Sequence, residues 1–380
     1  MADIALLGAT GFVGRLTCAY LGQHLPAGAS WQIAGRNRAK LDSLADAIES
    51  EGGSRPEVVV ADVNDADSMT RLAEGARVLA TTVGPYLQYG EAAVRACATA
   101  GTDYVDLTGE PEFVDRMWLR YHDTAVRSGA RLVHACGFDS VPYDLGVLRT
   151  VQKLGPYDAP VRVRGYIRTS AMFSAGTLQS AIGQISRTRQ ASQTGQLRRS
   201  QEPRSAGRKV RGGGEIGRGP RGRGWALPLP TIDPQIVKRS ARANPAYGDD
   251  FTYEHYAWFQ RLPMMAGTIA GAAVIGLAVQ LSPVRNLLAR LLASAGGPSK
   301  KRRDASWFHL LVLASSGDAT ATTHVSGGDP GYDETAVMLS ESAMCLAFDE
   351  LPEASGQTTT ATAMGDALMA RLIRAGITIE

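Results

Sequence analysis

The stretch that decides the fold reads Asp3-Ile4-Ala5-Leu6-Leu7-Gly8-Ala9-Thr10-Gly11-Phe12-Val13-Gly14. Its short apolar run is typical of a buried parallel strand, and the helical pattern of Arg15–Leu21 follows the glycines. A strand, a G-x-x-G-x-x-G turn and a helix, in this order, are the context of a dinucleotide-binding fingerprint. The glycines then serve a tight turn, the approach of backbone to a pyrophosphate, and close packing of helix on strand. The alternative is a purely structural turn. The predicted cofactor contacts here are Gly8, Thr10, Gly11, Phe12, Val13 and Gly14.

The second predicted strand, Trp31–Gly35, indicates which dinucleotide binds. Enzymes that use NAD usually have Asp or Glu at the end of this strand, bonded to the ribose 2′-hydroxyl. No acidic residue occurs from Trp31 to Lys40, whereas Arg36 and Arg38 flank Asn37. Because a guanidinium can bind phosphate through two parallel hydrogen bonds, we predict NADP(H), held at these three residues. The alternative is a solvated basic loop that starts a helix.

Composition sets the size and the expected compartment. The chain of 380 residues can hold two domains, and its 44% hydrophobic content is that of a globular protein. The cysteines have neither paired nor C-x-x-C spacing, so we expect reduced, mostly buried thiols, with no disulfide and no bound metal. No signal peptide is evident, which predicts a cytoplasmic protein or one associated with the inner face of the membrane. The four cysteines are Cys18, Cys97, Cys136 and Cys345.

Residues 1–150 alternate strands with helices, and the connections are short. Beyond the two strands above, the pattern predicts strands at residues 58–61, 77–82, 104–107 and 131–135. The alternation predicts an α/β fold: an N-terminal Rossmann-type, doubly wound parallel sheet with helices on both faces. Ligands of such sheets bind beyond the carboxyl ends of the strands. The residues that follow strands therefore complete the predicted cofactor site with Asp62, Val83, Gly84 and Pro85.

Beyond about residue 155 the alternation stops, and a second, α+β domain is predicted. We expect an NADP-binding domain at 1–150, a substrate or dimerisation domain at 151–350, and a C-terminal helix at 351–380 that returns to the first domain. Helices are predicted at Thr177–Arg187 and at Thr335–Phe348, the second of them packed between the domains. A homodimer formed through the second domain is also plausible on this organisation.

The stretch from Arg187 to Arg223 is strongly basic. It carries eleven Arg and Lys residues against two Glu, a net charge of +9 in a chain whose total is +3. One interpretation is a mobile loop. The other is an anion-facing loop for a phosphopantetheine carrier, a nucleotide or an acidic lipid. Nucleic acid is not expected as a partner, since Trp225 is the only aromatic residue near the stretch.

The stretch from Leu262 to Val284 carries no charge. It exceeds the roughly 20 residues that a membrane span needs, but Ala and Gly dilute it and Pro263 and Pro283 bracket it. We favour a buried or lipid-facing hairpin helix; a true transmembrane span and a plain core helix are the alternatives. An apolar helix in a substrate domain suggests a hydrophobic acyl substrate or peripheral contact with a membrane.

With these residues in place, the chain resembles the saccharopine dehydrogenase-like family, and most closely its trans-acting enoyl reductase branch. The resemblance implies NADPH-dependent reduction of an α,β-unsaturated acyl chain in lipid or polyketide biosynthesis, on a separate synthase. An acyl carrier protein of that synthase is the candidate carrier of the chain. The basic stretch matches no motif of the family. The pieces that carry the resemblance are residues 8–14, Ala34-Gly35-Arg36, Thr82-Val83-Gly84-Pro85-Tyr86, residues 101–110, Cys136-Gly137-Phe138-Asp139-Ser140-Val141-Pro142 and Gly328-Asp329-Pro330-Gly331-Tyr332.

Enoyl reduction requires a hydride placed over the β-carbon, a donor to the enolate oxygen, and a proton for the α-carbon. Tyr86 follows the fourth strand, so its phenol is a candidate donor to a carbonyl oxygen; the alternative is a tyrosine that packs the loop. Glu110 and Asp139 also follow strands and are candidate proton donors or ribose ligands, or else caps of the next helix. No tyrosine is followed by lysine four residues later, which excludes the short-chain dehydrogenase dyad.

Three functions compete at this point. The first is the trans-acting enoyl reductase with a lipid-like acyl substrate. The second is a saccharopine-type amino-acid dehydrogenase, whose substrate carries several carboxylates and requires an Arg-lined pocket; the uncharged stretch argues against it. The third is a non-catalytic, nucleotide-binding and membrane-associated protein that kept the fold, which the intact glycines disfavour.

Overall fold

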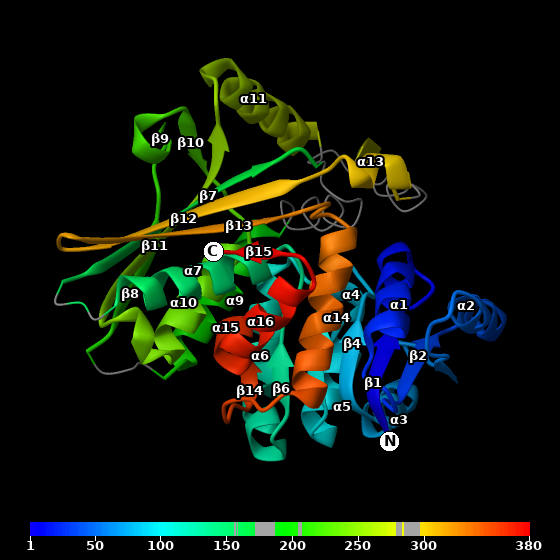
Figure 1. The fold of residues 1–380 in the computed structure, drawn as a ribbon. Helices are drawn as coiled ribbons and strands as arrows, with labels where there is room; N and C mark the ends of the chain where they lie inside the picture. Colours follow the sequence, from blue (N-terminus) through cyan, green and yellow to red (C-terminus); the bar gives the residue numbers. More distant parts are fainter. Residues whose placement is uncertain (156, 158, 172–186, 204–206, 279–282, 285–296) are drawn as a thin grey trace. The chain divides into compact units, whose positions relative to one another are not determined.

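The computed structural model describes residues 1–155, 157, 159–171, 187–203, 207–278, 283–284 and 297–380 (Figure 1). The chain divides into two compact units. Unit 1 comprises Met1–Val141 and Gly331–Gly376, and unit 2 comprises Pro142–Pro330 and Ile377–Glu380. The sequence places the first boundary at 150, whereas the structure places it nearer 141. Each unit is thus built from two separate pieces of chain.

Unit 1 contains the predicted parallel sheet. Its seven strands lie in the order β14-β6-β5-β4-β1-β2-β3, and every pair is parallel. Six of them are the predicted strands, and the C-terminal piece adds a seventh at the β6 edge. The apolar run of β1 lies in the middle of this sheet and is almost wholly buried, as a central parallel strand requires. The strands are β1 (Ala2–Leu7), β2 (Trp31–Gly35), β3 (Glu57–Val60), β4 (Ala76–Thr81), β5 (Asp103–Asp106), β6 (Arg131–Val133) and β14 (Gly356–Thr358).

Helices connect the strands of unit 1, and polar side chains cap several of them. Asn37 caps α2 by accepting a hydrogen bond from the Lys40 amide, and Asp65 caps α3 in the same way. These caps end the preceding loops within a few residues and so keep the connections short. The helices of this unit are α1 (Phe12–His24), α2 (Arg38–Ser50), α3 (Ala66–Glu74), α4 (Tyr86–Tyr89), α5 (Glu91–Ala100), α6 (Pro111–Ser128), α14 (Asp333–Phe348), α15 (Thr360–Ala363) and α16 (Gly365–Arg374).

The helix α14 belongs to unit 1, although the sequence places residues up to 350 in the second domain. It packs against α1 and against β4 and β5, and nearly all of its side chains from Ala336 to Ala347 are buried. The apolar sequence of this stretch predicts a buried helix, but the hydrophobic pattern does not indicate against which sheet the helix packs. The C-terminal helix α16 also lies in unit 1 and packs on α14.

Unit 2 contains a mixed eight-stranded sheet in the order β15-β13-β12-β7-β11-β10-β9, with β8 paired to β11. The β7–β11 and β8–β11 pairs are parallel, and the other pairs are antiparallel. This arrangement is the α+β architecture that the sequence predicts. The strands are β7 (Val161–Thr169), β8 (Lys209–Gly213), β9 (Gly217–Arg218), β10 (Trp225–Pro228), β11 (Asp250–Phe259), β12 (Phe308–Ser316), β13 (Ala319–Gly327) and β15 (Thr378–Ile379).

The basic stretch (Arg187–Arg223) and the uncharged stretch (Leu262–Val284) each form helices of unit 2. The helix predicted at 177–187 lies outside the described residues, except for Arg187. Alternate residues of β7, such as Val161 and Val163, are buried, and the intervening arginines are exposed. The helices are α7 (Val141–Leu154), of which the first residue belongs to unit 1, α9 (Thr188–Gln201), α10 (Asp233–Ala243), α11 (Leu262–Ala278), α13 (Lys300–Asp304) and the 3-10 turns η1 (Pro220–Gly222) and η2 (Pro245–Tyr247).

The basic stretch is more ordered than the loop that one interpretation expects. It forms α9, β8, β9 and η1, with residues 204–206 outside the described part. Several of its charges are paired locally, because Arg198 bridges Glu202 at 2.7 Å and Arg211 pairs with Asp250. Because Arg211 lies on β8 and Asp250 on its partner strand β11, this ion pair joins the two strands.

The uncharged stretch forms α11 over residues 262–278, and residues 279–282 lie outside the described part. Only Met265 of this helix is buried, so a plain core helix is wrong, and so is a buried helix, the first of the two possibilities that we favour from the sequence. Within the part of the chain that the structure describes, no helix combines the length and the apolar character needed to cross a membrane.

Candidate active site

The glycine turn between β1 and α1 has the geometry that its sequence predicts. Gly8 has φ = +89°, a conformation that favours glycine, and a Cβ there would lie 2.7 Å from Thr82 Oγ1. A Cβ on Gly14 would lie 2.3 Å from the carbonyl oxygen of Gly8, so the helix approaches the strand as closely as glycine allows. Gly11 differs from both, because a Cβ there meets only the Gly8 oxygen at 3.3 Å. Gly11 is also exposed, so the turn is less crowded there than at Gly8 or Gly14.

The first turn of α1 begins at that exposed glycine. Gly11 is the N-cap residue, and no side chain caps the helix. The amide groups of the first turn and the positive end of the helix dipole thus suit an anion such as a pyrophosphate. Phe12 is partly exposed and packs edge-on against Tyr332, with ring centroids 5.0 Å apart. Thr10 receives the Arg15 Nε hydrogen bond at its carbonyl oxygen, and Val13 lies in the first turn.

The end of β2 offers one cation without a local partner. Arg38 donates through Nε to Asp42 at 3.0 Å, and Asn37 accepts from the Lys40 amide at 3.0 Å. Arg36 is exposed, and the described residues supply it with no ion-pair or hydrogen-bond partner. Of the three residues that the sequence assigns to the 2′-phosphate, Arg36 is therefore the one whose charge remains available.

The loops after β3 and β4 lie at the same sheet edge. Asp62 Oδ1 accepts from the backbone and side-chain nitrogens of Asn64, both at 3.0 Å, so it also stabilises its own turn. Val83 lies against the glycine turn, with its Cγ2 2.8 Å from the position of a Cβ on Gly8. Gly84 is exposed and Pro85 begins the short helix α4. The structure thus brings the post-β4 loop beside the predicted pyrophosphate site.

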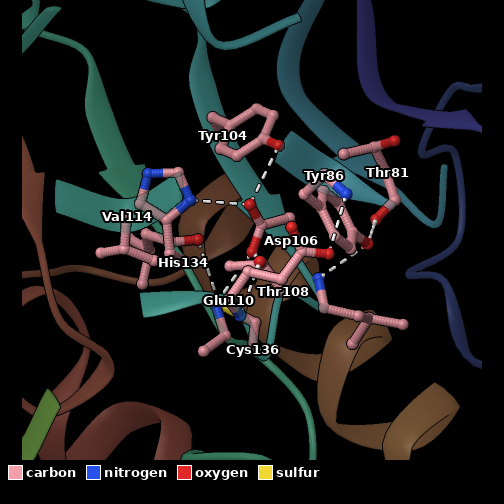
Figure 2. Close-up of polar contacts among 12 residues, drawn as sticks. Thr81, Tyr86, Tyr104, Asp106, Thr108, Glu110, Val114, His134 and Cys136 are labelled. Atoms are coloured by element: carbon pink, nitrogen blue, oxygen red, sulfur yellow. Dashed lines mark hydrogen bonds and ion pairs between the residues drawn. The ribbon is translucent and has the colours of Figure 1, made fainter. Parts of the chain in front are cut away.

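The hydroxyl of Tyr86, a predicted donor to a substrate carbonyl oxygen, is engaged in two hydrogen bonds within the protein (Figure 2). Its hydroxyl donates to the Thr81 carbonyl at 3.1 Å and accepts from the Leu107 amide at 3.1 Å. The side chain is buried, and burial together with the charge of Asp106 raises the pKa of Tyr86 well above its usual range. The phenol therefore ties the end of β4 to the end of β5, as the loop-packing alternative expects.

Glu110 is likewise committed to structure. Its two carboxylate oxygens accept hydrogen bonds from the amides of Tyr86 at 3.1 Å and Leu87 at 2.9 Å. It therefore caps the preceding short helix α4, and not the helix that follows, whose N-cap side chain makes no capping bond. Both carboxyl oxygens of Glu110 are thus engaged within the protein, and its catalytic role stays a prediction.

A buried Asp–His–Tyr cluster, which the sequence analysis does not single out, joins β5 to β6 (Figure 2). Asp106 Oδ2 lies 2.7 Å from His134 Nδ1 and accepts from the Tyr104 hydroxyl at 3.0 Å. Its Oδ1 accepts from the amides of Thr108 at 3.0 Å and Ala135 at 2.9 Å. One carboxylate thus fixes the loops that follow both strands. The sequence feature that points to this cluster is Asp106, an acidic residue at the end of a strand, because a carboxyl buried there needs several hydrogen-bond partners.

Asp139 is the one predicted catalytic residue whose carboxyl stays available. It is half-buried in the loop after β6, and among the described residues its carboxyl oxygens have no hydrogen-bond or ion-pair partner. Its Oδ2 lies 3.4 Å from the position of a Cβ on Gly109, so the loops after β5 and β6 meet there. Burial raises the pKa of Asp139 to about 6. The neighbouring Phe138 amide donates to Thr335 Oγ1 at 3.1 Å, which anchors this loop to α14.

Comparison with known proteins agrees with this geometry. Residues 4–133 match the family described as the saccharopine dehydrogenase NADP binding domain. A protein of Mycobacterium tuberculosis named for an inferred trans-acting enoyl reductase activity is 35% identical over 416 residues, which cover 100% of this chain and 97% of its own. A trans-acting enoyl reductase of Mycobacterium ulcerans is 32% identical over 415 residues, with the same coverage. The apo, histidine-tagged saccharopine dehydrogenase (L-Glu forming) of Saccharomyces cerevisiae superposes with a TM-score of 0.56 at 11% identity, covering 100% of this chain and 99% of that one.

Unit 1 is thus the dinucleotide-binding part of an oxidoreductase. The chain belongs to the saccharopine dehydrogenase-like family, in the branch of the trans-acting enoyl reductases. Its cofactor is NADP(H). The residues present fit this cofactor, because the exposed turn at Gly11 suits a pyrophosphate and the end of β2 offers Arg36 in place of an acid. The similarity to the yeast enzyme supports the fold alone.

Proposed function

We propose that this protein reduces an α,β-unsaturated acyl chain with NADPH, and that a separate synthase presents this chain, in the simplest case on an acyl carrier protein. Two lines of support meet here. The relatives that align along the whole chain are named trans-acting enoyl reductases. The observation that carries the proposal is Asp139, a carboxyl with a raised pKa and no local partner at the cofactor-binding edge of the sheet.

The bound dinucleotide supplies a hydride for the β-carbon of the substrate. Asp139 in its protonated form then gives its proton to the α-carbon, so a saturated acyl chain and an aspartate carboxylate result. A pKa near 6 leaves a usable fraction of the acid at neutral pH, and solvent restores the proton afterwards. Asp106, Tyr86 and Glu110 hold the surrounding loops and act as positioning residues.

The test is turnover of enoyl thioesters by the Asp139→Asn variant. We expect kcat to fall by roughly a hundredfold or more, while NADPH affinity stays unchanged, because only the proton donor is lost. The wild-type rate should fall as pH rises through about 6, since the protonated carboxyl is the active form. Asp123→Asn, an exposed aspartate on α6, is the matched control and should keep full activity.

Different results would exclude this role or this reaction. An Asp139→Asn enzyme with normal kcat and an unchanged pH profile would show that water or another group supplies the proton. A wild-type protein that binds NADPH but reduces no enoyl thioester would overturn the proposed reaction. Activity on an imine-forming amino acid and 2-oxo acid pair would then favour the saccharopine-type alternative, and no turnover at all would favour the non-catalytic one.

The proposed contact of Arg36 with the 2′-phosphate has its own test. Arg36→Ala should weaken NADPH binding by roughly tenfold to a hundredfold and leave NADH binding unchanged, because only NADPH carries that phosphate. Arg38→Ala should have a smaller effect, since Asp42 already pairs with that guanidinium. Titration of tryptophan fluorescence measures both affinities. Equal losses for the two cofactors would remove Arg36 from the phosphate site.

A further inference from the structure

The helix α11 combines two properties that a soluble surface does not usually combine. Its seventeen residues contain no charged side chain, and Thr268 is its only polar one. Nevertheless, every residue except Met265, Gly276 and Ala278 is exposed. In Figure 1 the helix follows β11 and projects from the sheet of unit 2. A helix that is apolar all round is normally buried in a core or in lipid, so this surface requires a cover.

The exposed side chains point in every direction around the helix axis. Successive residues of an α-helix turn by about 100°, so Ile275 and Leu277 lie on nearly opposite sides. They are 54% and 73% exposed. Val274 and Ile269 extend the exposed surface over further sides of the same helix. A protein partner or a second copy of this chain covers one face of a helix, whereas hydrocarbon chains surround all of it.

The small and polar residues of α11 agree with a lipid environment. Thr268 donates its hydroxyl to the Met264 carbonyl at 3.0 Å, so its only polar side chain is satisfied within the helix. At Gly267, Gly271 and Gly276 an added Cβ would meet nothing within 4 Å, so these glycines are not there to fit a neighbour in the described part of the chain. Nothing polar on this helix therefore opposes entry into hydrocarbon.

The charges of the surrounding sequence indicate the kind of lipid surface. From Arg261 to Arg303 the sequence carries seven Arg and Lys residues and no Asp or Glu. Four of them form the exposed helix α13, in which Lys300 pairs with Asp304 at 2.8 Å while Lys301 is exposed. Clustered basic residues that flank an apolar helix in the sequence complement anionic headgroups, and each contributes attraction close to the membrane surface.

We propose that α11 inserts its apolar surface into an anionic membrane, and that the basic residues that flank it in the sequence, Lys300–Arg303 among them, bind the headgroups. The proposal concerns unit 2 and needs neither the cofactor nor turnover, so it stands apart from the enoyl reductase activity.

The test is flotation of the full-length protein with vesicles, in the absence of NADPH and substrate. Wild-type protein should float with vesicles of phosphatidylcholine and phosphatidylglycerol, and less with phosphatidylcholine alone or at high salt. The double variant Ile275→Asp/Leu277→Asp should lose binding by roughly tenfold or more, because two charges enter the inserted surface. Both positions are exposed, and circular dichroism and NADPH titration check that the variant folds. Lys301→Gln should lose roughly fivefold.

The control for an added aspartate is Ile216→Asp, which places one such charge at a 56% exposed position in unit 2 outside α11. It should bind vesicles as the wild type does. Absence of wild-type binding to the anionic vesicles would overturn the proposal, and so would equal binding by the double variant. If the wild type instead self-associates in a sedimentation series and the double variant does not, with no vesicle binding by either, a second copy covers α11 and the lipid assignment is wrong.

Discussion

Two mainly apolar helices of similar length, α14 and α11, have opposite environments. The α14 helix has sixteen residues, most of them apolar, and packs inside unit 1 against α1, β4 and β5. The α11 helix has seventeen residues, even more of them apolar, and is almost wholly exposed in unit 2. Neither sequence shows a distinct polar face. An apolar helix therefore indicates a need for cover, and the rest of the structure decides whether the protein itself supplies it.

The polar residues distinguish the two helices. In α14 the buried Glu341 accepts from the Tyr20 hydroxyl at 2.7 Å and pairs with Arg371 at 3.1 Å. Arg371 also forms a bidentate pair with Asp349, at 2.6 and 2.7 Å. These contacts attach α14 to α1 and α16, so they fix its position in the core. In α11 the one polar side chain bonds within its own helix.

The largest expected difference between the helices concerns truncation of leucine. Leu339→Ala in α14 removes a fully buried side chain and should lower the free energy of unfolding by about 2–5 kcal/mol. Leu277→Ala in α11 removes a side chain that is 73% exposed and should change it by less than about 0.5 kcal/mol. Denaturant titration of both variants measures the difference. Equal losses would contradict the assigned environments.

A smaller effect is expected from the charge that anchors α14. Glu341→Gln keeps the shape of the side chain but weakens its bonds to Tyr20 and Arg371, so unfolding should become easier by about 1–3 kcal/mol. The exposed Glu353 provides the control, and Glu353→Gln should be neutral. Thermal unfolding at neutral pH compares the two. A neutral Glu341→Gln would show that apolar packing alone holds the helix.

The smallest effect concerns pH. Burial opposes ionisation of Asp349, but hydrogen bonds from Arg371 and Cys345 outweigh it, so the pKa of Asp349 lies below its usual value. A carboxyl with a lowered folded pKa stabilises the fold above its unfolded pKa and loses this contribution as pH falls through the folded value. At neutral pH, Asp349→Asn should lower the free energy of unfolding by less than about 1 kcal/mol. The resulting difference in Tm between wild type and variant should shrink as the solution is made acidic. A difference that grows in acid would reverse the assigned sign.

The sequence predicts the backbone geometry of the glycine turn, whereas it does not indicate which partners the candidate catalytic side chains bind. Gly8 and Gly14 adopt the close approaches that their spacing requires, because a glycine fingerprint encodes local backbone geometry. The roles of Tyr86 and Glu110 depend on the Leu107 and Leu87 amides, which fold next to them from other elements. Position after a strand identifies all three candidate catalytic residues equally. Only the hydrogen bonds distinguish Tyr86 and Glu110, which connect loops, from Asp139, whose carboxyl has no partner among the described residues.

The sequence by itself determined the parallel sheet, the glycine turn, the absence of an acid after β2 and the presence of two mainly apolar helices, α11 and α14. These features are local, since hydrophobic periodicity and glycine spacing act over a few neighbouring residues. The tertiary structure alone decided that residues 331–376 complete unit 1 and that α11 remains exposed. It also decided which polar groups at the sheet edge find partners. Such outcomes depend on contacts between residues far apart in the chain, and periodicity carries no record of them.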